Sequence, residues 1–384
     1  MKQEVNDSLI EMIKRLLPGL LFSIGVILLG IYLAELSGEL LINFNILPSG
    51  SASPISSIFI AIIVGLLIRN VFGLHHIFNE GVSFAVKYAL RAGIILLGLR
   101  LSLIEALKLG AWGLPLILVC IVSGLTVTLY FTTRFNQSQR LGTLIACGTG
   151  ICGVTAIMAT SPVIKAKDNE ISYAVANITI FGLIGMLFYP YLAQFFFADD
   201  PIKAGLFLGT AIHDTAQVAG ASLIYSQIYG IEQVVDVATV TKLTRNLFII
   251  AVIPFVSYLF FKQENTHQGS KEHLPKWYQL VPVFVIGFLL LSLIRTIGDL
   301  TVTKTGQAFQ LINPVMWQDI YTNISSFGST YLLGIAMAGV GLSTDFKMFK
   351  GLGIKPFYIG FIAAISVGIV SLILISLFGH LIVI

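Results

Sequence analysis

Residues 141–166 read LGTLIACGTGICGVTAIMATSPVIKA, an apolar stretch that is interrupted by glycines. The stretch is long enough to span a membrane, but each glycine in it weakens a helix by about 1 kcal/mol relative to alanine. Non-helical backbone at membrane depth persists only where protein or a water-filled cavity satisfies its polar groups. We therefore expect a broken helix, whose free N–H groups suit an anion. The alternative is close helix packing through small residues. The candidate binding residues of this break are Gly148, Thr149, Gly150 and Thr155.

A second interrupted stretch, residues 205–222, reads GLFLGTAIHDTAQVAGAS. It places His213, Asp214 and Gln217 in an apolar span, and ionisable groups at membrane depth typically mark substrate or ion pathways. His213 and Gln217 share one face if the helix continues through them. Asp214 can carry a proton or bind Na⁺, and histidine can change charge near neutral pH. The alternative is a buried polar pair that fixes helix geometry.

Three cations also fall inside apolar segments. Lys242 and Arg245 are three residues apart on one predicted helix face, and Arg91 lies in a separate apolar segment. Arginine donates two parallel hydrogen bonds to sulfate or carboxylate, so these cations favour an anionic substrate. They could instead form ion pairs with Asp214 or Asp236, or extend to the membrane interface.

The composition places these stretches in a membrane protein. Of the 384 residues, 56% are hydrophobic and 11% are charged, and the mean hydropathy is +0.90. Soluble domains carry roughly 25% charged residues, so this composition excludes a disordered chain, a nucleic-acid binder and an ordinary cytosolic enzyme. We expect an all-α polytopic protein with about eleven transmembrane helices. Their expected ranges are 16–36, 54–70, 83–103, 110–132, 140–164, 170–196, 203–228, 234–261, 276–296, 322–342 and 356–381.

Basic residues predict the orientation, because they collect in short cytoplasmic loops. Residues 1–15 form a cytoplasmic segment in this scheme, the N-terminus is inside, the C-terminus is outside, and residues 262–276 form the longest loop. Six basic residues are exceptions, because this scheme places them on the external side of the membrane: Arg100, Lys108, Lys165, Lys167, Arg295 and Lys304. If one weakly predicted span were re-entrant, the orientation of every later segment in the membrane would be reversed.

Two internal similarities are present. Gly93, Gly98 and Pro115 match Gly334, Gly339 and Pro356 at an offset of 241 residues, in segments expected to run in opposite directions. Inverted repeats of this kind are common in secondary transporters, although chance among glycine-rich helices is the alternative. A weaker similarity relates residues 148–161 to 209–222, segments that run parallel in the eleven-span scheme, so the repeat boundary stays open.

The segments GTGICGVTAIMATSPVIKAKDNEISYAVANITIFG, GTAIHDTAQVAGAS and TKLTRNLF together resemble the YeiH-type family of bacterial membrane proteins, whose members are described as sulfate exporters. The resemblance covers roughly residues 15–384. It implies a more distant similarity to bile-acid–sodium symporters and cation–proton antiporters. In those folds two interrupted helices cross at the transport site. The resemblance therefore implies a scaffold, a core for which 140–196 and 203–261 are candidates, an elevator-like motion and a homodimer.

These observations predict a secondary transporter of the bacterial inner membrane that occupies residues 16–384. It would export a small anion, with sulfate as the named candidate, and use H⁺ or Na⁺ as the coupling ion. The alternatives are an importer or exchanger of organic sulfonates or carboxylates, and an anion channel. We expect no enzyme, no resident cofactor, no metal site beyond Na⁺ near Asp214, and no nucleic-acid partner.

Overall fold

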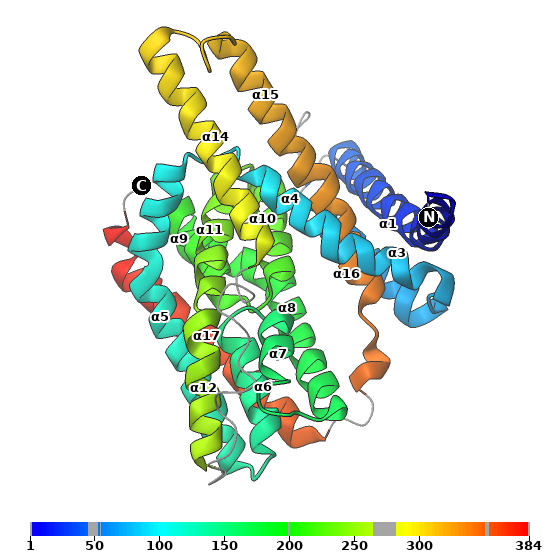
Figure 1. Cartoon of the computed structure of the whole chain (residues 1–384), viewed down its shortest axis with the longest axis vertical. Helices are drawn as coiled ribbons and strands as arrows, with labels where there is room; N and C mark the ends of the chain where they lie inside the picture. The colour runs from blue at the N-terminus through cyan, green and yellow to red at the C-terminus, as the bar shows by residue number, and fades with distance from the viewer. Residues whose placement is uncertain are drawn as a thin grey trace. The chain divides into compact units, whose positions relative to one another are not determined.

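The computed structural model describes residues 2–44, 53, 55–198, 200–263, 282–349 and 353–382. In this part of the chain every regular element is a helix, apart from a single bridge between Ala308 and Ile312. The protein is thus an all-helical polytopic membrane protein (Figure 1). From residue 264 onward, the loop expected at 262–276 lies outside the described residues.

The chain divides into two compact units, and the first contains residues 1–103, 223–231 and 287–347. Its long helices bury small and aliphatic residues against one another, such as Gly65 of α2 against Leu342 of α16. Its elements are α1 (Lys2–Asn43), α2 (Ser57–Leu67), η1 (Ile68–Phe72), η2 (His76–Phe78), α3 (Asn79–Phe84), η3 (Ala85–Ala89), α4 (Leu90–Leu97), most of α14 (Val283–Thr305), α15 (Pro314–Phe327), η4 (Gly328–Leu332), α16 (Leu333–Ser343) and η5 (Phe346–Phe349).

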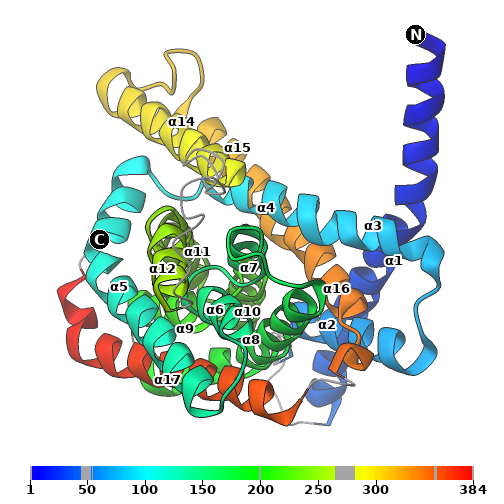
Figure 2. The same ribbon diagram turned by 60° about the horizontal axis from the view of Figure 1, so that its bottom comes forward.

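The second unit contains residues 104–222, 232–286 and 348–384. In Figure 2, α5 and α17 lie on the outside of the helices that carry the two interrupted stretches. Its elements are α5 (Leu103–Arg134), α6 (Gln139–Gly150), α7 (Val154–Thr160), α8 (Asp168–Phe197), α9 (Pro201–Ala211), α10 (Thr215–Tyr229, whose end belongs to the first unit), α11 (Gln233–Leu247), α12 (Ile249–Gln263), α17 (Ile354–Phe378) and η6 (Gly379–Leu381).

The first interrupted stretch folds back on itself instead of continuing across. Gly148 of α6 packs against Ile157 of α7, and the Cys147 thiol lies beside the Thr160 side chain. A continuous helix would separate Cys147 and Thr160 by roughly 20 Å. The two ends of the stretch also meet, because Ser138 donates to Glu170 at 2.6 Å. Residues 139–160 therefore form a helical hairpin, which we call the first hairpin.

The second interrupted stretch also reverses. Helix α9 runs parallel to α11, since Gly205 packs against Val237 and Gly209 packs against Thr241. The start of α11 therefore lies at the level of the start of α9. Helix α10, which connects the two, is long enough at about 22 Å to return the chain from the break to that level. Residues 201–229 form the second hairpin.

The two hairpins correct the expected number of spans. Ranges 140–164 and 203–228 were expected to cross the membrane, but each leaves on the side where it enters. Within the described residues, six helices are long and apolar enough to cross, or seven if the bent pair α11–α12 is one span. The expected span at 276–296 is also displaced, because α14 runs from Val283 to Thr305.

With two crossings fewer, the expected scheme has nine spans, an odd number, so the predicted placement of the two ends on opposite sides of the membrane is unchanged. In this nine-span scheme, the loop between α7 and α8 is expected on the same side of the membrane as the N-terminus. Lys165 and Lys167, two exceptions to the expected charge bias, lie in this loop. Lys203 of α9 moves to the outer side in the same step, so the positive-inside rule gains two basic residues and loses one.

The structure also relates the segments that match at an offset of 241 residues. A π-helix precedes both α4 and α16, and within the first unit α4 packs on η4 while α16 packs on η3. The segments α3–α4 and α15–α16 run in opposite directions in both views (Figures 1 and 2). Opposite directions in matching segments are what an inverted repeat requires.

Candidate functional site

The tips of the two hairpins touch inside the second unit. Gly153, at the turn of the first hairpin, has a positive φ of 67°. A Cβ atom at this position would lie 2.6 Å from Oδ2 and 3.0 Å from Cα of Asp214, in the turn of the second hairpin. Only glycine tolerates both the backbone angle and this approach. We call this region, residues 149–155 and 210–217, the tip contact.

Lys242 satisfies backbone carbonyls that the two turns leave free. Its ammonium donates to the carbonyl oxygens of Ile151 at 3.0 Å and Ile212 at 3.1 Å, and to that of His213. Ile151 and Ile212 are the C-cap residues that directly follow α6 and α9. A lysine ammonium has three donors, and all three are used here.

Arg245, one turn along α11, bonds the same two helix ends. Its Nε donates to the Gly150 carbonyl at 3.0 Å, and Nη2 donates to that of Thr149 at 2.6 Å. Nη1 donates to the carbonyls of Thr210 at 2.5 Å and Ile212 at 3.3 Å. Cations at helix C-termini also offset the negative end of the helix dipole.

The two cations therefore cap helices, which is neither of the roles weighed from sequence. They lie on one face of α11 as expected, and their side chains are 1% and 0% exposed. No ion pair of Lys242 or Arg245 with an acidic side chain occurs within 4 Å in the described part of the chain. Their donors in this structure serve carbonyl oxygens, so the expected direct contact with substrate stays a prediction.

Asp214 caps the opposite kind of helix end. Its carboxylate accepts the backbone N–H of Ala216 at 2.9 Å, in the first turn of α10. The backbone N–H of Val154, the first residue of α7, is a further partner of the same carboxylate. Carboxylates stabilise helix N-termini by accepting N–H bonds and by offsetting the positive end of the dipole. The protein thus places its own anion where two helix N-termini converge.

Gln217 and His213 do not share a helix face, because α10 begins only at Thr215. Gln217 instead bonds back to the turn: its Oε1 accepts the Asp214 N–H at 3.3 Å, and its Nε2 donates to the Thr179 carbonyl of α8 at 3.2 Å. This side chain therefore ties the second hairpin to α8.

Several buried polar atoms in the tip contact and on the neighbouring helix α11 have no hydrogen-bond partner. His213 lies beside the Thr149 backbone, and its Nδ1 has no hydrogen-bond partner. The Asn246 amide donates to the Thr215 hydroxyl at 3.1 Å, while its Oδ1 is unpaired. The hydroxyls of Thr149 and Thr241 are unpaired as well. Buried polar atoms without partners are uncommon in folded proteins, so this concentration suggests a place for a ligand.

The tip contact has a buried side and an accessible side. The cations and the helix C-termini are buried, whereas Thr155 is exposed and Val154, Asp214 and Thr215 are partly accessible. A solute that reaches the tip contact therefore meets the helix N-termini, Asp214 and two hydroxyls first.

The remaining candidate, Arg91, belongs to the first unit. It lies on α4 with an exposed side chain, so the site built here does not include it. Across the described residues, no group of three or more His, Cys, Asp or Glu side chains is placed to hold a metal ion.

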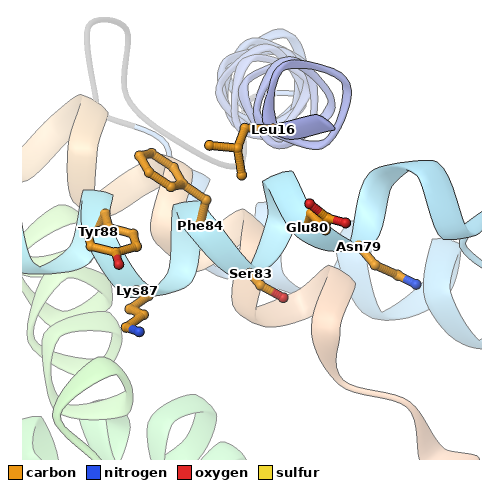
Figure 3. A pocket seen from close by; sticks show the side chains of 7 residues that line it. All are labelled: Leu16, Asn79, Glu80, Ser83, Phe84, Lys87 and Tyr88. Atoms are coloured by element: carbon orange, nitrogen blue, oxygen red, sulfur yellow. The ribbon is translucent and has the colours of Figure 1, made fainter. Parts of the chain in front are cut away.

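The first unit has a surface pocket of about 380 Å³ (Figure 3). In the figure, Leu16 of α1 and Phe84 of α3 face each other, and Lys87 points to another side of the helix. Its charged residues, Glu80 and Lys87, are exposed to solvent or lipid. The pocket therefore lacks the buried, unpaired polar atoms that distinguish the tip contact.

Three contributors to the tip contact were not among the predicted binding residues, although Thr215 lies in the second interrupted stretch. Val154 and Thr215 supply the first residues of α7 and α10, and Asn246 reaches Thr215 from α11. Asn246 directly follows Arg245 in an apolar segment, and a polar residue in that position was a usable signal.

Comparison with known proteins identifies the family. The family model described as "Conserved hypothetical protein 698" matches residues 18–360. A UPF0324 membrane protein of Bacillus anthracis is 35% identical over 327 residues, which cover 84% of this chain and 87% of that protein. One from Streptococcus agalactiae is 32% identical, with 85% and 90% covered. One from Clostridium tetani is 28% identical, with 91% and 95% covered. The chain therefore belongs to the UPF0324 membrane protein family.

Proposed function

We propose that the protein is a secondary transporter of a small anion and that the tip contact is its transport site. The observation that carries this proposal is the meeting of two helix breaks in buried polar surroundings. In transporter folds, the ends of interrupted helices bind substrates and coupling ions. The resemblance seen in the sequence points to the same class and names sulfate as the first substrate to test.

The charges at the tip contact favour an anion. Lys242, Arg245 and an ionised Asp214 together carry one net positive charge. Protonation of Asp214 would raise this to two, which a bound sulfate dianion would cancel. Net charge in a low-dielectric interior is costly, so protonation of Asp214 and binding of the dianion should support each other.

The hydrogen bonds suggest the same coupling. An ionised Asp214 occupies the N–H groups of Ala216 and Val154, which are the groups that an anion would use. A proton on the carboxylate weakens its hold on these donors and removes its repulsion of the anion. The hydroxyls of Thr155 and Thr215 lie on the accessible side and can complete the site.

This scheme makes the anion and the proton move together. Sulfate export would then require exchange against an external anion or an outward proton gradient, and import would follow the usual inward gradient. A small sulfonate or carboxylate fits the same donors, with one charge less to cancel. We further propose that the protein lies in the bacterial inner membrane with its N-terminus inside, and acts as a homodimer.

The test is flux of labelled sulfate in proteoliposomes under an imposed pH gradient, with the membrane potential clamped. We expect the gradient to drive sulfate accumulation, and we expect methanesulfonate and acetate to compete where the site accepts them. Asp214→Asn should remove the dependence on the gradient and preserve sulfate–sulfate exchange, because asparagine imitates the protonated acid.

The matched control is Asp200→Asn. Asp200 caps α9 by accepting the Lys203 N–H at 3.0 Å, so both substitutions affect an N-cap in the same unit, and asparagine is also a good N-cap. Asp200→Asn should keep the gradient dependence. Unchanged gradient dependence in a folded Asp214→Asn variant would refute the coupling role, and ohmic, uncoupled flux in the wild type would indicate an anion channel.

A further inference from the structure

The ammonium of Lys242 occupies a site built from backbone oxygens. The carbonyls of Ile151, Ile212 and His213 converge on its Nζ, and they come from the turns of both hairpins. These carbonyls are free for this purpose because α6 ends at Gly150 and α9 ends at Ala211. Lys242 itself comes from a third helix, α11, and its side chain is 1% exposed.

Such a cluster of oxygens is the chemistry of a monovalent cation site. Carbonyl oxygens can replace the hydration shell of an alkali ion, and carbonyls at the C-terminal ends of interrupted helices coordinate Na⁺ in transporter folds. An ammonium group carries the same charge and donates three hydrogen bonds to the same oxygens.

We propose that Lys242 is a tethered cation that fills a monovalent-cation site between the two hairpins, so that the tip contact needs no Na⁺ or K⁺. The covalent tether gives the ammonium a very high effective concentration, and a free ion cannot compete with it under ordinary conditions. This deepens the proposed function by excluding Na⁺ as the coupling ion at this site, and only that consequence rests on the proposed function.

The proposal predicts a gain of cation dependence on removal of the ammonium. Lys242→Met keeps a flexible apolar side chain and leaves three buried carbonyls unpaired, and Lys242→Ala leaves more room for an ion. The purified variants are melted in NaCl, KCl, NH₄Cl and choline chloride at equal ionic strength, with choline as the ion too large to enter. We expect both variants to melt at lower temperature than the wild type in choline, and NaCl or NH₄Cl to restore the loss in a saturable manner. The wild type should melt at the same temperature in all four salts.

The matched control is Lys203→Met, which removes a lysine in the same unit whose Nζ pairs with Asp200 at 3.0 Å near the surface. It should show no cation-specific recovery of the melting temperature.

Equal destabilisation of the Lys242 variants in all four salts would overturn the proposal. So would failure of both variants to fold in every salt, because a free cation should replace the missing ammonium. A specific Na⁺ shift in the wild type would also contradict it. Because melting needs no transport, cation recovery without sulfate flux would preserve the tethered cation and reject the anion transporter.

Discussion

Arg245 is a structural residue in this conformation, because its guanidinium donates four hydrogen bonds to the ends of α6 and α9. A residue that contacts only substrate would instead have free donors facing an accessible space. The distinction matters because, from the sequence alone, an arginine in an apolar segment is readily interpreted as a ligand of an anionic substrate. Its backbone partners are invisible in the sequence, since every residue has a carbonyl.

Arg245→Met should therefore destabilise the fold itself. The substitution leaves the carbonyls of Gly150, Thr149 and Thr210 buried without partners, and each such group costs about 1–3 kcal/mol. We expect a loss of at least ~3 kcal/mol in the free energy of unfolding, measured by melting in detergent. Arg69→Met is the matched control, because Arg69 pairs with Asp345 at 3.3 Å in a partly exposed position, and such pairs contribute about 0–1 kcal/mol. A stable Arg245→Met variant that has lost only sulfate binding would show that the arginine acts on the substrate.

At the residue scale, the sequence identified the polar residues of the tip contact but not their partners. His213, Asp214, Lys242 and Arg245 were all singled out because charge at membrane depth is rare. Their division into helix-capping cations and a helix-capping anion could not be predicted, because it depends on which helix ends the folded chain brings together.

At the scale of elements, the glycines of the first interrupted stretch predicted a break but not its direction. A stretch of this length with a central break can cross the membrane or turn back, and both forms bury the same apolar residues. Two tertiary contacts show that the stretch turns back. Cys147 lies beside Thr160, and the Ser138 hydroxyl donates to the Glu170 carboxylate. The similarity between the two interrupted stretches, 61 residues apart, gains a structural meaning here, because both stretches fold as hairpins.

Gly153→Ala tests the contact between the hairpin tips. Alanine at a positive φ costs roughly 1–2 kcal/mol by itself. Gly230→Ala is the reference for an uncrowded glycine of positive φ, because Gly230 has a φ of 72° and nothing lies within 4 Å of the position of its Cβ. At Gly153 the Cβ would also press on Asp214, so we expect an additional loss of at least ~2 kcal/mol in melting experiments. Equal losses in the two variants would contradict the close contact of the tips.

At the scale of the whole molecule, the charge bias and the hairpins have to be considered together. The eleven-span scheme and the hairpin arrangement both leave the N-terminus inside and the C-terminus outside, because two crossings are removed at once. The schemes differ only from the end of the first hairpin to the second hairpin, a region that includes Lys167 before α8 and Lys203 in α9. Basic residues alone could not resolve this region, because each scheme leaves some of them on the outer side.

Cysteine labelling decides between the two schemes. Thr133, at the end of α5, and Lys167, before α8, are both exposed, and the hairpin arrangement places both inside. The eleven-span scheme places Thr133 inside and Lys167 outside. His380 is exposed in η6, directly after α17, and should be outside in either case. The native cysteines Cys120, Cys147 and Cys152 are buried and should not react with the label.

In intact cells, a membrane-impermeant maleimide should label His380→Cys and leave Thr133→Cys and Lys167→Cys unlabelled until the membrane is permeabilised. Labelling of Lys167→Cys in intact cells, with Thr133→Cys protected, would mean that the first interrupted stretch crosses the membrane and that its hairpin form is wrong.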